Sequence, residues 1–379
     1  MFHIVLGLPW LIVVLRWLAP LPWDISIKIV VAGILLVGSQ HLLINRLSSG
    51  SIFDPEYPRP WIIVLNVLFG AMVFLAVMQI LLDAICLGPL PLIGYFPSVP
   101  PQLRYGMGGI ALALASWGVA QAIRVPALRN VEIAISGLPS EFDGYRILQL
   151  TDLHLSRLFP RSWAEAVVAK SNALNPDLTV VTGDFIDGGI EARRDDVAPL
   201  AGLRAPDGVL GIPGNHEYFF GYDEWMKHDS GLGIRMLTNT HVVIVRGQSS
   251  IVVAGVTDLA SVGSKYPAPD LASALSGAPA GAKVILLEHQ PRMAERSAQA
   301  GVALQLSGHT HGGMVLGLDR LVARANNGFV SRLYQVGGMK LYVNNGTALW
   351  PGFALRLGRP SELTVFTLKP SSVTKETAP

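Results

Sequence analysis

The sequence predicts an N-terminal bundle of transmembrane helices followed by a soluble α/β domain, and three observations lead to this fold class. Half of the 379 residues are hydrophobic and only 15% are charged. The charges are unevenly distributed, because residues 1 to 124 contain only ten of them. From about residue 130, short β-rich runs alternate with turn residues and Ala-rich stretches, a pattern typical of α/β domains.

Apolar stretches in the first third of the chain predict transmembrane helices. Residues 60 to 82 are 23 consecutive positions without a charged side chain, and residues 105 to 123 are another 19. A shorter stretch at 27 to 45 follows a mostly apolar one at 2 to 22, which suggests a helical hairpin. We therefore predict about four spans in the region 1 to 124, at 2–22, 27–45, 60–82 and 105–123.

The first stretch has an alternative interpretation as a cleaved signal peptide. It lacks a basic start and a small-residue cleavage pattern, and further spans follow it, so we favour a span. With four spans and the N-terminus inside, Arg46, Arg59, Arg124 and Arg129 all face the cytoplasm, as does the soluble domain. A count of three spans would reverse this orientation.

Composition argues against several classes of function. The formal net charge is only +2, and no run of Lys and Arg is interleaved with aromatic residues, so we predict no nucleic-acid partner. The single cysteine, Cys86, excludes an internal disulfide and a multi-thiolate metal site. A transporter would need ionisable residues deep inside its spans, whereas His3, Arg16 and His41 lie near span ends.

The second part of the chain is predicted as one α/β domain over residues 130 to 368, with a polar tail at 369 to 379. A helix is expected at 161 to 174, with Ser162 as its N-cap and Glu165 three residues later. Apolar runs predict strands at 145–150, 178–181, 209–212, 242–245, 251–256, 283–287, 303–306, 341–343 and 363–368.

Five short polar clusters each follow one of these runs. Side chains at the carboxyl ends of strands are where open α/β sheets place their binding sites. The clusters are Asp152-Leu-His154, Gly183-Asp184, Gly214-Asn215-His216-Glu217, Glu288-His289 and Gly308-His309-Thr-His311, and they hold five of the nine histidines.

The residue types in these clusters suit a pair of divalent metal ions. Such ions accept carboxylate oxygen, amide oxygen and imidazole nitrogen, and an Asp can share its two oxygens between two ions. In Asp152-x-His154 and His309-x-His311 the side chains are two positions apart and can converge on one ion. Each cluster alone could be an ordinary turn or helix cap. Five in this order predict a dinuclear metal centre.

The clusters and their flanking residues resemble the motifs of calcineurin-like metallophosphoesterases. The resemblance covers about residues 130 to 368, because the stretch from Arg356 to Leu363 is similar to the closing strand of the bacterial membrane-associated branch. The matching segments are Leu148 to Ser156, Thr182 to Asp187, Gly214 to Glu217, His289 to Pro291 and Gly308 to Gly313. The family implies a sandwich of two mixed β-sheets flanked by helices, with metal ions held by loops at one end.

The resemblance also implies the metal ligands. The first ion would be bound by Asp152, His154 and His311, the second by Asn215, His289 and His309, and Asp184 would bridge the two. Manganese, iron, zinc and magnesium all remain open as the metal. A water molecule held between the ions would lose a proton and attack phosphorus in line with the leaving group.

Two further roles follow from the resemblance. His216 would donate a proton to the leaving alcohol, and Asp187 would orient it and favour its charged form, unless Asp187 is simply a turn residue. Related protein phosphatases have an arginine where Gly188 stands, which argues against a phosphoprotein substrate. Arg356 is the alternative phosphate contact, or else a solvated strand-edge residue. Met314 replaces a glutamine found in many relatives, with no effect that the sequence can specify.

The resulting prediction is a membrane-anchored phosphoesterase. A bilayer anchor raises the local concentration of substrates dissolved in lipid, so we expect a small-molecule or lipid-linked phosphate. The aromatic run from Tyr218 to Met226 is either core packing or an apolar lip that touches lipid. The alternative function, a metal-binding or scaffold module without turnover, predicts missing ligands, and none of the seven is missing.

Overall fold

The computed structural model describes residues 2–88, 94–95 and 97–371, and the chain divides into two compact units. The helical unit consists of Met1–Ile123 with Trp350–Leu357, and the sheet unit of Arg124–Leu349 with Gly358–Pro379. We call Trp350–Leu357 the return loop. It differs from the expected organisation, because the sequence places these residues inside the α/β domain, whereas they cluster with the helices.

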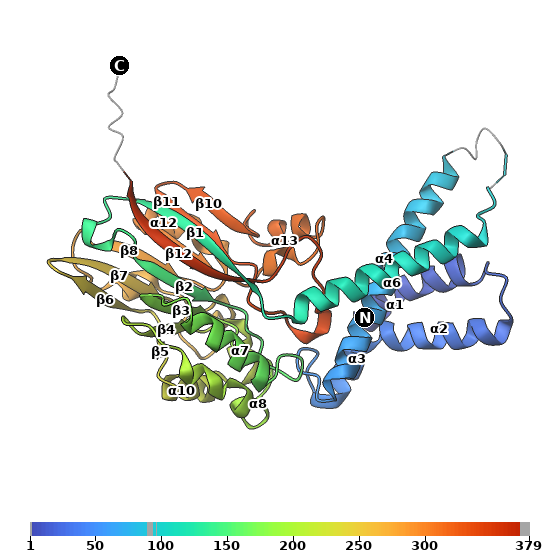
Figure 1. Ribbon diagram of the computed structural model, residues 1–379, viewed down its shortest axis with the longest axis horizontal. Helices are drawn as coiled ribbons and strands as arrows, with labels where there is room; N and C mark the ends of the chain where they lie inside the picture. The colour runs from blue at the N-terminus through green and yellow to red at the C-terminus, as the bar shows by residue number, and fades with distance from the viewer. Residues whose placement is uncertain (1, 89–93, 96, 372–379) are drawn as a thin grey trace, which may run out of the picture. The chain divides into compact units, whose positions relative to one another are not determined.

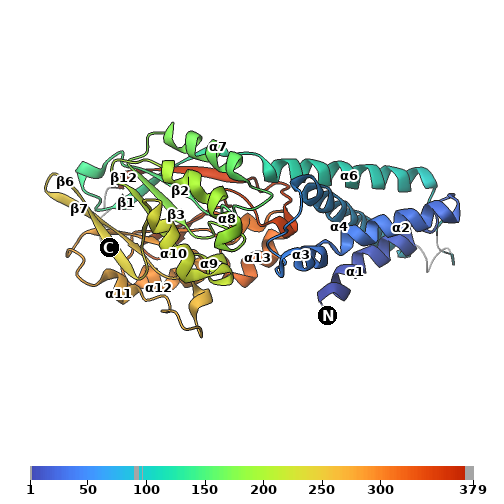
Figure 2. The ribbon, with the colours of Figure 1, turned by 90° about the horizontal axis from the view of Figure 1, so that it is seen from below.

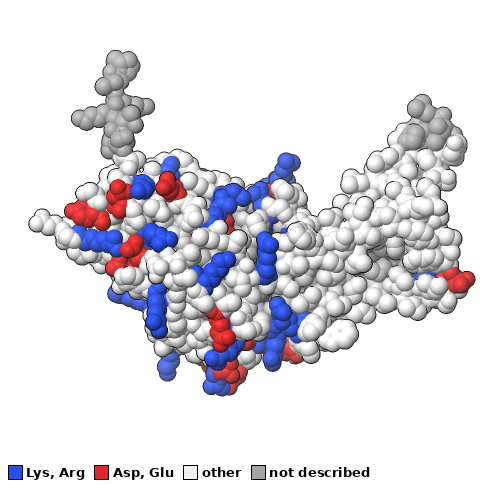
Figure 3. All heavy atoms as spheres, viewed as in Figure 1, with Lys and Arg blue, Asp and Glu red and all other residues white. Residues whose placement is uncertain are grey.

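Two helices of the helical unit are long and apolar enough to cross a membrane, namely α4 (Arg59–Leu87) and α6 (Pro101–Ile123). A third candidate is the pair α2 (Ile25–Ser39) and α3 (His41–Ser49), which is bent by 54°. The first stretch is shorter, because α1 (Phe2–Ile12) continues as a π-helix only to Leu18. Among the described residues, two of the four predicted spans meet the length and hydropathy of a membrane helix, or three if the bent pair is one span, and the count of four stays a prediction. Figure 3 shows few charged side chains over this unit.

Buried polar side chains of the helices hold the return loop. His41 of α3 places its Nε2 atom 2.5 Å from the Gly352 carbonyl oxygen. The Asn66 amide of α4 donates to the Pro351 carbonyl at 2.8 Å and accepts from the Ala354 N–H at 2.7 Å. Both side chains are almost completely buried. Because a buried amide without partners would be costly, these bonds fix the loop within the helical unit.

The sheet unit is a sandwich of two six-stranded mixed sheets flanked by helices, which confirms the predicted fold class (Figures 1 and 2). The first sheet has the order β1-β12-β2-β3-β4-β5 and the second the order β10-β11-β9-β8-β7-β6. The first sheet comprises β1 (Ala127–Ser136), β2 (Arg146–Leu150), β3 (Leu178–Thr182), β4 (Val209–Ile212), β5 (Arg235–Met236) and β12 (Glu362–Ser371). The second comprises β6 (Thr240–Arg246), β7 (Ser249–Gly255), β8 (Lys283–Leu287), β9 (Leu304–Ser307), β10 (Arg332–Val336) and β11 (Met339–Val343).

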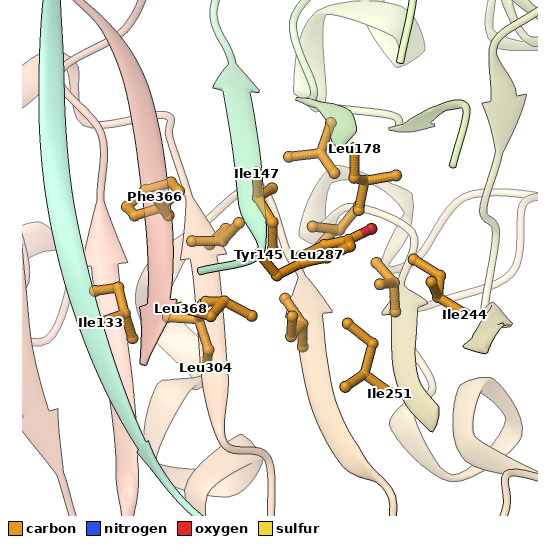
Figure 4. Packing of buried hydrophobic residues seen from close by; sticks show 14 of the residues in the cluster. Ile133, Tyr145, Ile147, Leu178, Ile244, Ile251, Leu287, Leu304, Phe366 and Leu368 are labelled. Atoms are coloured by element: carbon orange, nitrogen blue, oxygen red, sulfur yellow. The ribbon is translucent and has the colours of Figure 1, made fainter. Parts of the chain in front are cut away.

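The apolar inner faces of the two sheets form the core of this unit. Figure 4 shows Ile147 and Phe366 of the first sheet packed with Ile251, Leu287 and Leu304 of the second. Each of these side chains is fully buried. Burial of one such side chain contributes about 1.5–3 kcal/mol, so the core fixes the strand ends from which the polar clusters emerge.

Helices flank the sandwich. They are α7 (Arg161–Asn172), α8 (Ile190–Val197), α9 (Asn215–Phe220), α10 (Tyr222–Gly231), α11 (Leu271–Leu275), α12 (Ala294–Gln299) and α13 (Asp319–Ala325). The helix expected at 161 to 174 is present as α7, but Pro160 occupies its N-cap position, so Ser162 is not the cap. The tail also begins later than expected, because β12 runs to Ser371, and residues 372–379 lie outside the described residues.

Asp229 of α10 gives the sheet unit a pH-dependent stability. Its carboxylate is fully buried, and neither oxygen has a hydrogen-bond partner among the described residues. Burial, helped by the charge of Glu217, raises the pKa of Asp229 well above its usual value. The unfolded chain loses this proton near pH 4 and the folded chain keeps it, so the contribution of Asp229 to the free energy of unfolding decreases as the pH rises above about 4.

We expect Asp229→Asn to raise the midpoint of thermal unfolding at pH 8 by a few degrees and to change it little at pH 4. The amide has the same size and cannot ionise, and 1 kcal/mol corresponds to about 2–4 °C in a domain of this size. Thermal unfolding followed by tryptophan fluorescence at both pH values measures the effect. Asp143→Asn is the control, because Asp143 is half-exposed beside Lys369 and should change neither midpoint. An equal shift at both pH values would contradict the prediction.

Candidate metal centre

The five polar clusters follow neighbouring strands, as the sequence predicts. Asp152 follows β2, Asp184 follows β3 and Asn215 follows β4, and these three strands are parallel neighbours. In the second sheet, His289 follows β8 and His309 follows β9, which are also parallel neighbours. Parallel neighbours end at the same edge of a sheet, so each sheet directs its polar side chains to one edge.

The structure brings all seven predicted metal ligands together in two adjoining groups. In each group, ligand atoms from three residues lie within 4.8 Å of one another, close enough to share one metal ion. The first group consists of Asp152, His154 and His311, and the second of Asp184, His289 and His309; a third set, His154, Asp184 and His216, overlaps both. The Asn215 amide oxygen adjoins the second group.

In the first group, two imidazole rings and a carboxylate point into one small volume. His154 Nε2 lies 3.3 Å from His311 Nε2, and Asp152 Oδ1 lies 3.6 Å from that same His311 atom. The other ring nitrogen of His154, Nδ1, contacts the Asp187 carboxylate at 3.2 Å. Such an outer partner fixes the ring and leaves Nε2 directed inward, which is the usual arrangement for a metal-bound histidine.

The second group has the same design. His289 Nδ1 lies 2.7 Å from the Thr182 carbonyl oxygen and donates to it, which leaves Nε2 directed inward. Although burial opposes the charge, Asp184 raises the pKa of His289 well above its usual value. The Asn215 oxygen lies 3.2 Å from His289 Nε2 and 2.9 Å from His309 Nδ1. Burial lowers the pKa of His309 to about 3, helped by the nearby His289, which keeps the ring in the neutral form that binds metal.

Asp184 lies between the two groups. Its Oδ2 atom is 3.2 Å from His289 Nε2 of the second group and 3.8 Å from His154 Nε2 of the first. The carboxylate is almost completely buried. Although burial opposes its charge, His289 and His216 hold the pKa of Asp184 well below its usual value. A charged carboxylate that faces both groups is suited to bridge two ions.

Backbone strain is concentrated on these residues. Five of the seven predicted ligands have a left-handed φ, namely Asp152 (52°), His154 (42°), Asp184 (54°), His309 (68°) and His311 (50°). This conformation costs roughly 1–2 kcal/mol per non-glycine residue and is typical of functional sites. Gly214 permits a close approach of two loops, because a Cβ atom there would lie 2.2 Å from Asp184 Oδ1 and 2.6 Å from Asp184 N. The site is therefore held in shape by the surrounding fold.

Glu217 supports the site in a way that the sequence did not specify. It is fully buried, and its carboxylate accepts hydrogen bonds from the N–H groups of Gly214 (2.6 Å), Asp184 (3.1 Å) and Phe185 (2.8 Å). Burial raises the pKa of Glu217 to about 7, and repulsion from Asp184 adds to this effect. The residue ties the loop after β3 to the loop after β4. Its place in the Asn-His-Glu cluster marks Glu217 as a candidate site residue. The loop that it binds is about 30 positions away in the sequence, so its partners were not predictable.

His216 and Asp187 lie beside the two groups. His216 Nδ1 is hydrogen-bonded to the Asp187 carboxylate, and its Nε2 lies 3.9 Å from Asp184 Oδ2. Burial lowers the pKa of His216, but the charges of Asp184 and Asp187 outweigh it and raise this pKa to about 9. Asp187 is fully buried and accepts contacts from two histidines, so it is more than a surface turn residue.

The aromatic run after Asn215 is core in part. Trp225 is fully buried and donates from Nε1 to the Gly188 carbonyl at 3.1 Å, and Tyr222 is buried as well. Phe219 is 53% exposed, and its ring centroid lies 5.3 Å from that of His216. Tyr218, Phe220 and Met226 are half-buried, so the apolar lip stays a prediction.

Arg356 belongs to the return loop of the helical unit, where its side chain is buried and its backbone N–H donates to the Gly118 carbonyl at 3.0 Å. It is not a solvated strand-edge residue, because it is buried and β12, which contains the strand expected at 363–368, starts at Glu362. A phosphate contact by Arg356 stays a prediction. Met314, where many relatives have glutamine, ends the metal loop with a φ of 61°.

Comparison with known proteins agrees with this geometry. Residues 145–313 match the family model of the calcineurin-like phosphoesterases. The chain is 33% identical over 270 residues to the uncharacterised metallophosphoesterase YkuE of Bacillus subtilis, a match that covers 69% of this chain and 92% of YkuE. It is 34% identical over 269 residues to a transmembrane protein with metallophosphoesterase domain from Danio rerio, covering 69% of this chain but only 61% of that relative. The solved structure of the calcineurin-like phosphoesterase YfkN from Bacillus subtilis aligns loosely, with 16% identity and a TM-score of 0.38 over 54% of this chain and 81% of that chain.

Proposed function

Because the chain belongs to the calcineurin-like metallophosphoesterases, we propose that it hydrolyses a phosphate ester with two divalent metal ions. The observation that supports this proposal is the position of Asp184 between two groups of buried nitrogen and oxygen donors. In this proposal one ion is held by Asp152, His154 and His311, the other by Asn215, His289 and His309, and Asp184 bridges them. Bound there, the ions would activate a water molecule and stabilise negative charge on the phosphate.

His216 is proposed to supply the proton that the leaving alcohol needs. The hydrogen bond to Asp187 engages Nδ1 and fixes the ring, so Nε2 is the nitrogen on the side of Asp184. A charged imidazole is the form that can donate a proton, and the carboxylates of Asp184 and Asp187 favour that form. Asp187 therefore acts as a positioning residue for both His216 and His154.

The proposed location of the enzyme is a membrane, with the bilayer as a partner and a small-molecule or lipid phosphate as substrate. The two or three apolar helices among the described residues support this proposal, as does the similarity to the Danio rerio relative, which is named a transmembrane protein. If α4 and α6 both span, the arginines before α4 and after α6 lie on the same side. Since cytoplasmic flanks carry an excess of Lys and Arg, we propose that Arg46, Arg59, Arg124 and Arg129 are cytoplasmic, together with the catalytic domain.

Metal removal tests the proposed chemistry directly. We expect EDTA to abolish hydrolysis of p-nitrophenyl phosphate or bis(p-nitrophenyl) phosphate, and manganese to restore it, because the donors without their ions cannot activate water. We also expect the chelator to lower the midpoint of thermal unfolding, since the ions bind the folded chain. Mass spectrometry of the metal content should give about two ions per chain. Hydrolysis that persists after complete removal of metal would contradict the proposal. Two bound ions without hydrolysis of either ester would instead favour a binding or scaffold module.

A further inference from the structure

The segment that follows the metal loop exposes apolar side chains. Leu316 is 64% exposed and Leu321 is 59% exposed, the first just before α13 and the second within it. A single exposed leucine is ordinary on a soluble protein. Leu316 and Leu321 are five positions apart, on a short segment that also contains half-buried Leu318 and Val322. Together these side chains form a local apolar surface.

Arginine side chains surround this surface. Arg320 and Arg324 are exposed and lie one turn apart on α13, so they flank Leu321 on the outward side of the helix. Neither forms an ion pair or a hydrogen bond through its side chain with any described residue. Arg332, at the start of β10, is exposed as well.

The segment itself carries no exposed acid. Between Met314 and Lys340 the sequence contains a single Asp or Glu, which is Asp319. Asp319 is buried, and its carboxylate is bonded to Arg359 and accepts the N–H groups of Gly317 (2.8 Å) and Arg320 (3.1 Å). The outward side of α13 therefore carries net positive charge next to leucine.

This surface is fixed to the metal loop. A Cβ atom on Gly313, two residues after His311, would lie 2.3 Å from Asp319 Cα, so α13 begins in direct contact with that loop. On its other side, Val315 pairs with Gly358, whose added Cβ would lie 2.2 Å from Leu316 Cδ1. Whatever binds Leu316 and Leu321 is thereby held close to His309 and His311.

We propose that Leu316, Arg320, Leu321 and Arg324 form a docking surface for a bilayer that contains anionic phospholipid. Leucine side chains enter the boundary between headgroups and acyl chains, while guanidinium groups bind the phosphates with paired hydrogen bonds. Two leucines give a weak contact, but a chain anchored by its own apolar helices meets the bilayer at high effective concentration. This inference rests on the proposed membrane attachment, and it would bring the metal loop to the surface where a lipid phosphate resides.

The test uses the full chain with Cys86→Ser and one new labelling site. Leu321→Cys carries an environment-sensitive fluorophore, and Val245→Cys on β6, where valine is 64% exposed, is the matched control. Both proteins are placed in nanodiscs of phosphatidylcholine alone or of phosphatidylcholine and phosphatidylglycerol in equal parts, with spin-labelled lipid as quencher. We expect the label at 321 to shift to shorter wavelength and to be quenched several-fold more than the label at 245, most strongly with phosphatidylglycerol.

A charge variant separates the anionic lipid from the apolar contact. Arg320→Gln with Arg324→Gln should remove the difference between the two lipid mixtures, whereas Arg235→Gln on β5 should leave it unchanged. Hydrolysis of a soluble chromogenic ester should be the same in all these proteins, because none of the changed residues is a proposed metal ligand.

The possible failures can be told apart. A chain that stays outside the discs overturns the membrane attachment and, with it, the docking. A chain inside the discs whose label at 321 is no more quenched than the label at 245 overturns the docking alone. A shift of the label at 321 that grows with protein concentration at constant lipid indicates contact with another copy of this chain and also overturns the proposal.

Discussion

Asp184→Ala is expected to abolish hydrolysis of a chromogenic phosphate ester and to deplete the bound metal. Asp184 is the carboxylate that faces both donor groups, with Oδ2 at 3.2 Å from His289 Nε2 and 3.8 Å from His154 Nε2. Without it, two ions would sit close together without a shared negative ligand, so their mutual repulsion would favour loss of at least one. We expect kcat/KM to fall by about 10³-fold or more, the upper range for loss of one preorganised electrostatic group.

Steady-state kinetics and the metal content of the same preparation measure this effect. Asp143→Ala is the matched control, because Asp143 is half-exposed beside Lys369 and should keep full activity and both ions. The metal content of Asp184→Asn should lie between those of Asp184→Ala and Asp143→Ala, since the amide retains one oxygen donor without charge. Equal activity in wild type and Asp184→Ala would refute the assignment of the bridging residue.

The second large effect is expected from His216→Gln and should depend on the leaving group. An ester of an aliphatic alcohol needs a proton as its P–O bond breaks, so we expect hydrolysis to slow by about 10²- to 10⁴-fold, the usual contribution of a general acid. A p-nitrophenyl ester releases p-nitrophenolate, which is a stable anion and needs no proton. Hydrolysis of this ester should therefore slow far less. The metal content should remain at the wild-type level, because His216 is not among the proposed ligands.

Comparison of kcat for the two esters provides the measurement. Asp187→Asn should show the same dependence on the leaving group with a smaller loss, about 10- to 100-fold, as expected of an outer partner of His216 and His154. Phe219→Leu, beside the His216 ring, is the control for a mere change of packing. A loss of the same size on both esters would contradict a role for His216 in proton donation.

Strands were predictable from the sequence where their side chains are buried. β2, β3 and β4 are buried along almost their entire length and therefore appear as short apolar runs. β1 and β10 were missed because most of their residues are exposed or half-buried, which removes the hydrophobic signal. β5 contains two residues, fewer than any pattern needs.

The candidate site was predictable as far as its residues lie next to strand ends. Asp152, Asp184 and His309 each follow a buried strand, so local order along the chain places them correctly. Contacts between distant segments could not be predicted from the sequence. The hydrogen bond from Asn66 to Pro351 joins positions 285 residues apart. Contacts of this kind assign the segment that contains Arg356 to the helical unit.

The return loop also bears on how such a protein could be assembled in evolution. The chain crosses from one unit to the other three times, after Ile123, after Leu349 and after Leu357. A gene fusion with a single junction at residue 124 would thus supply the helices without the eight residues that His41 and Asn66 hold in place. A sheet unit that acquires or exchanges the helical unit must change at two separate positions of its gene, so these helices and the segment from Trp350 to Leu357 are expected to be inherited together.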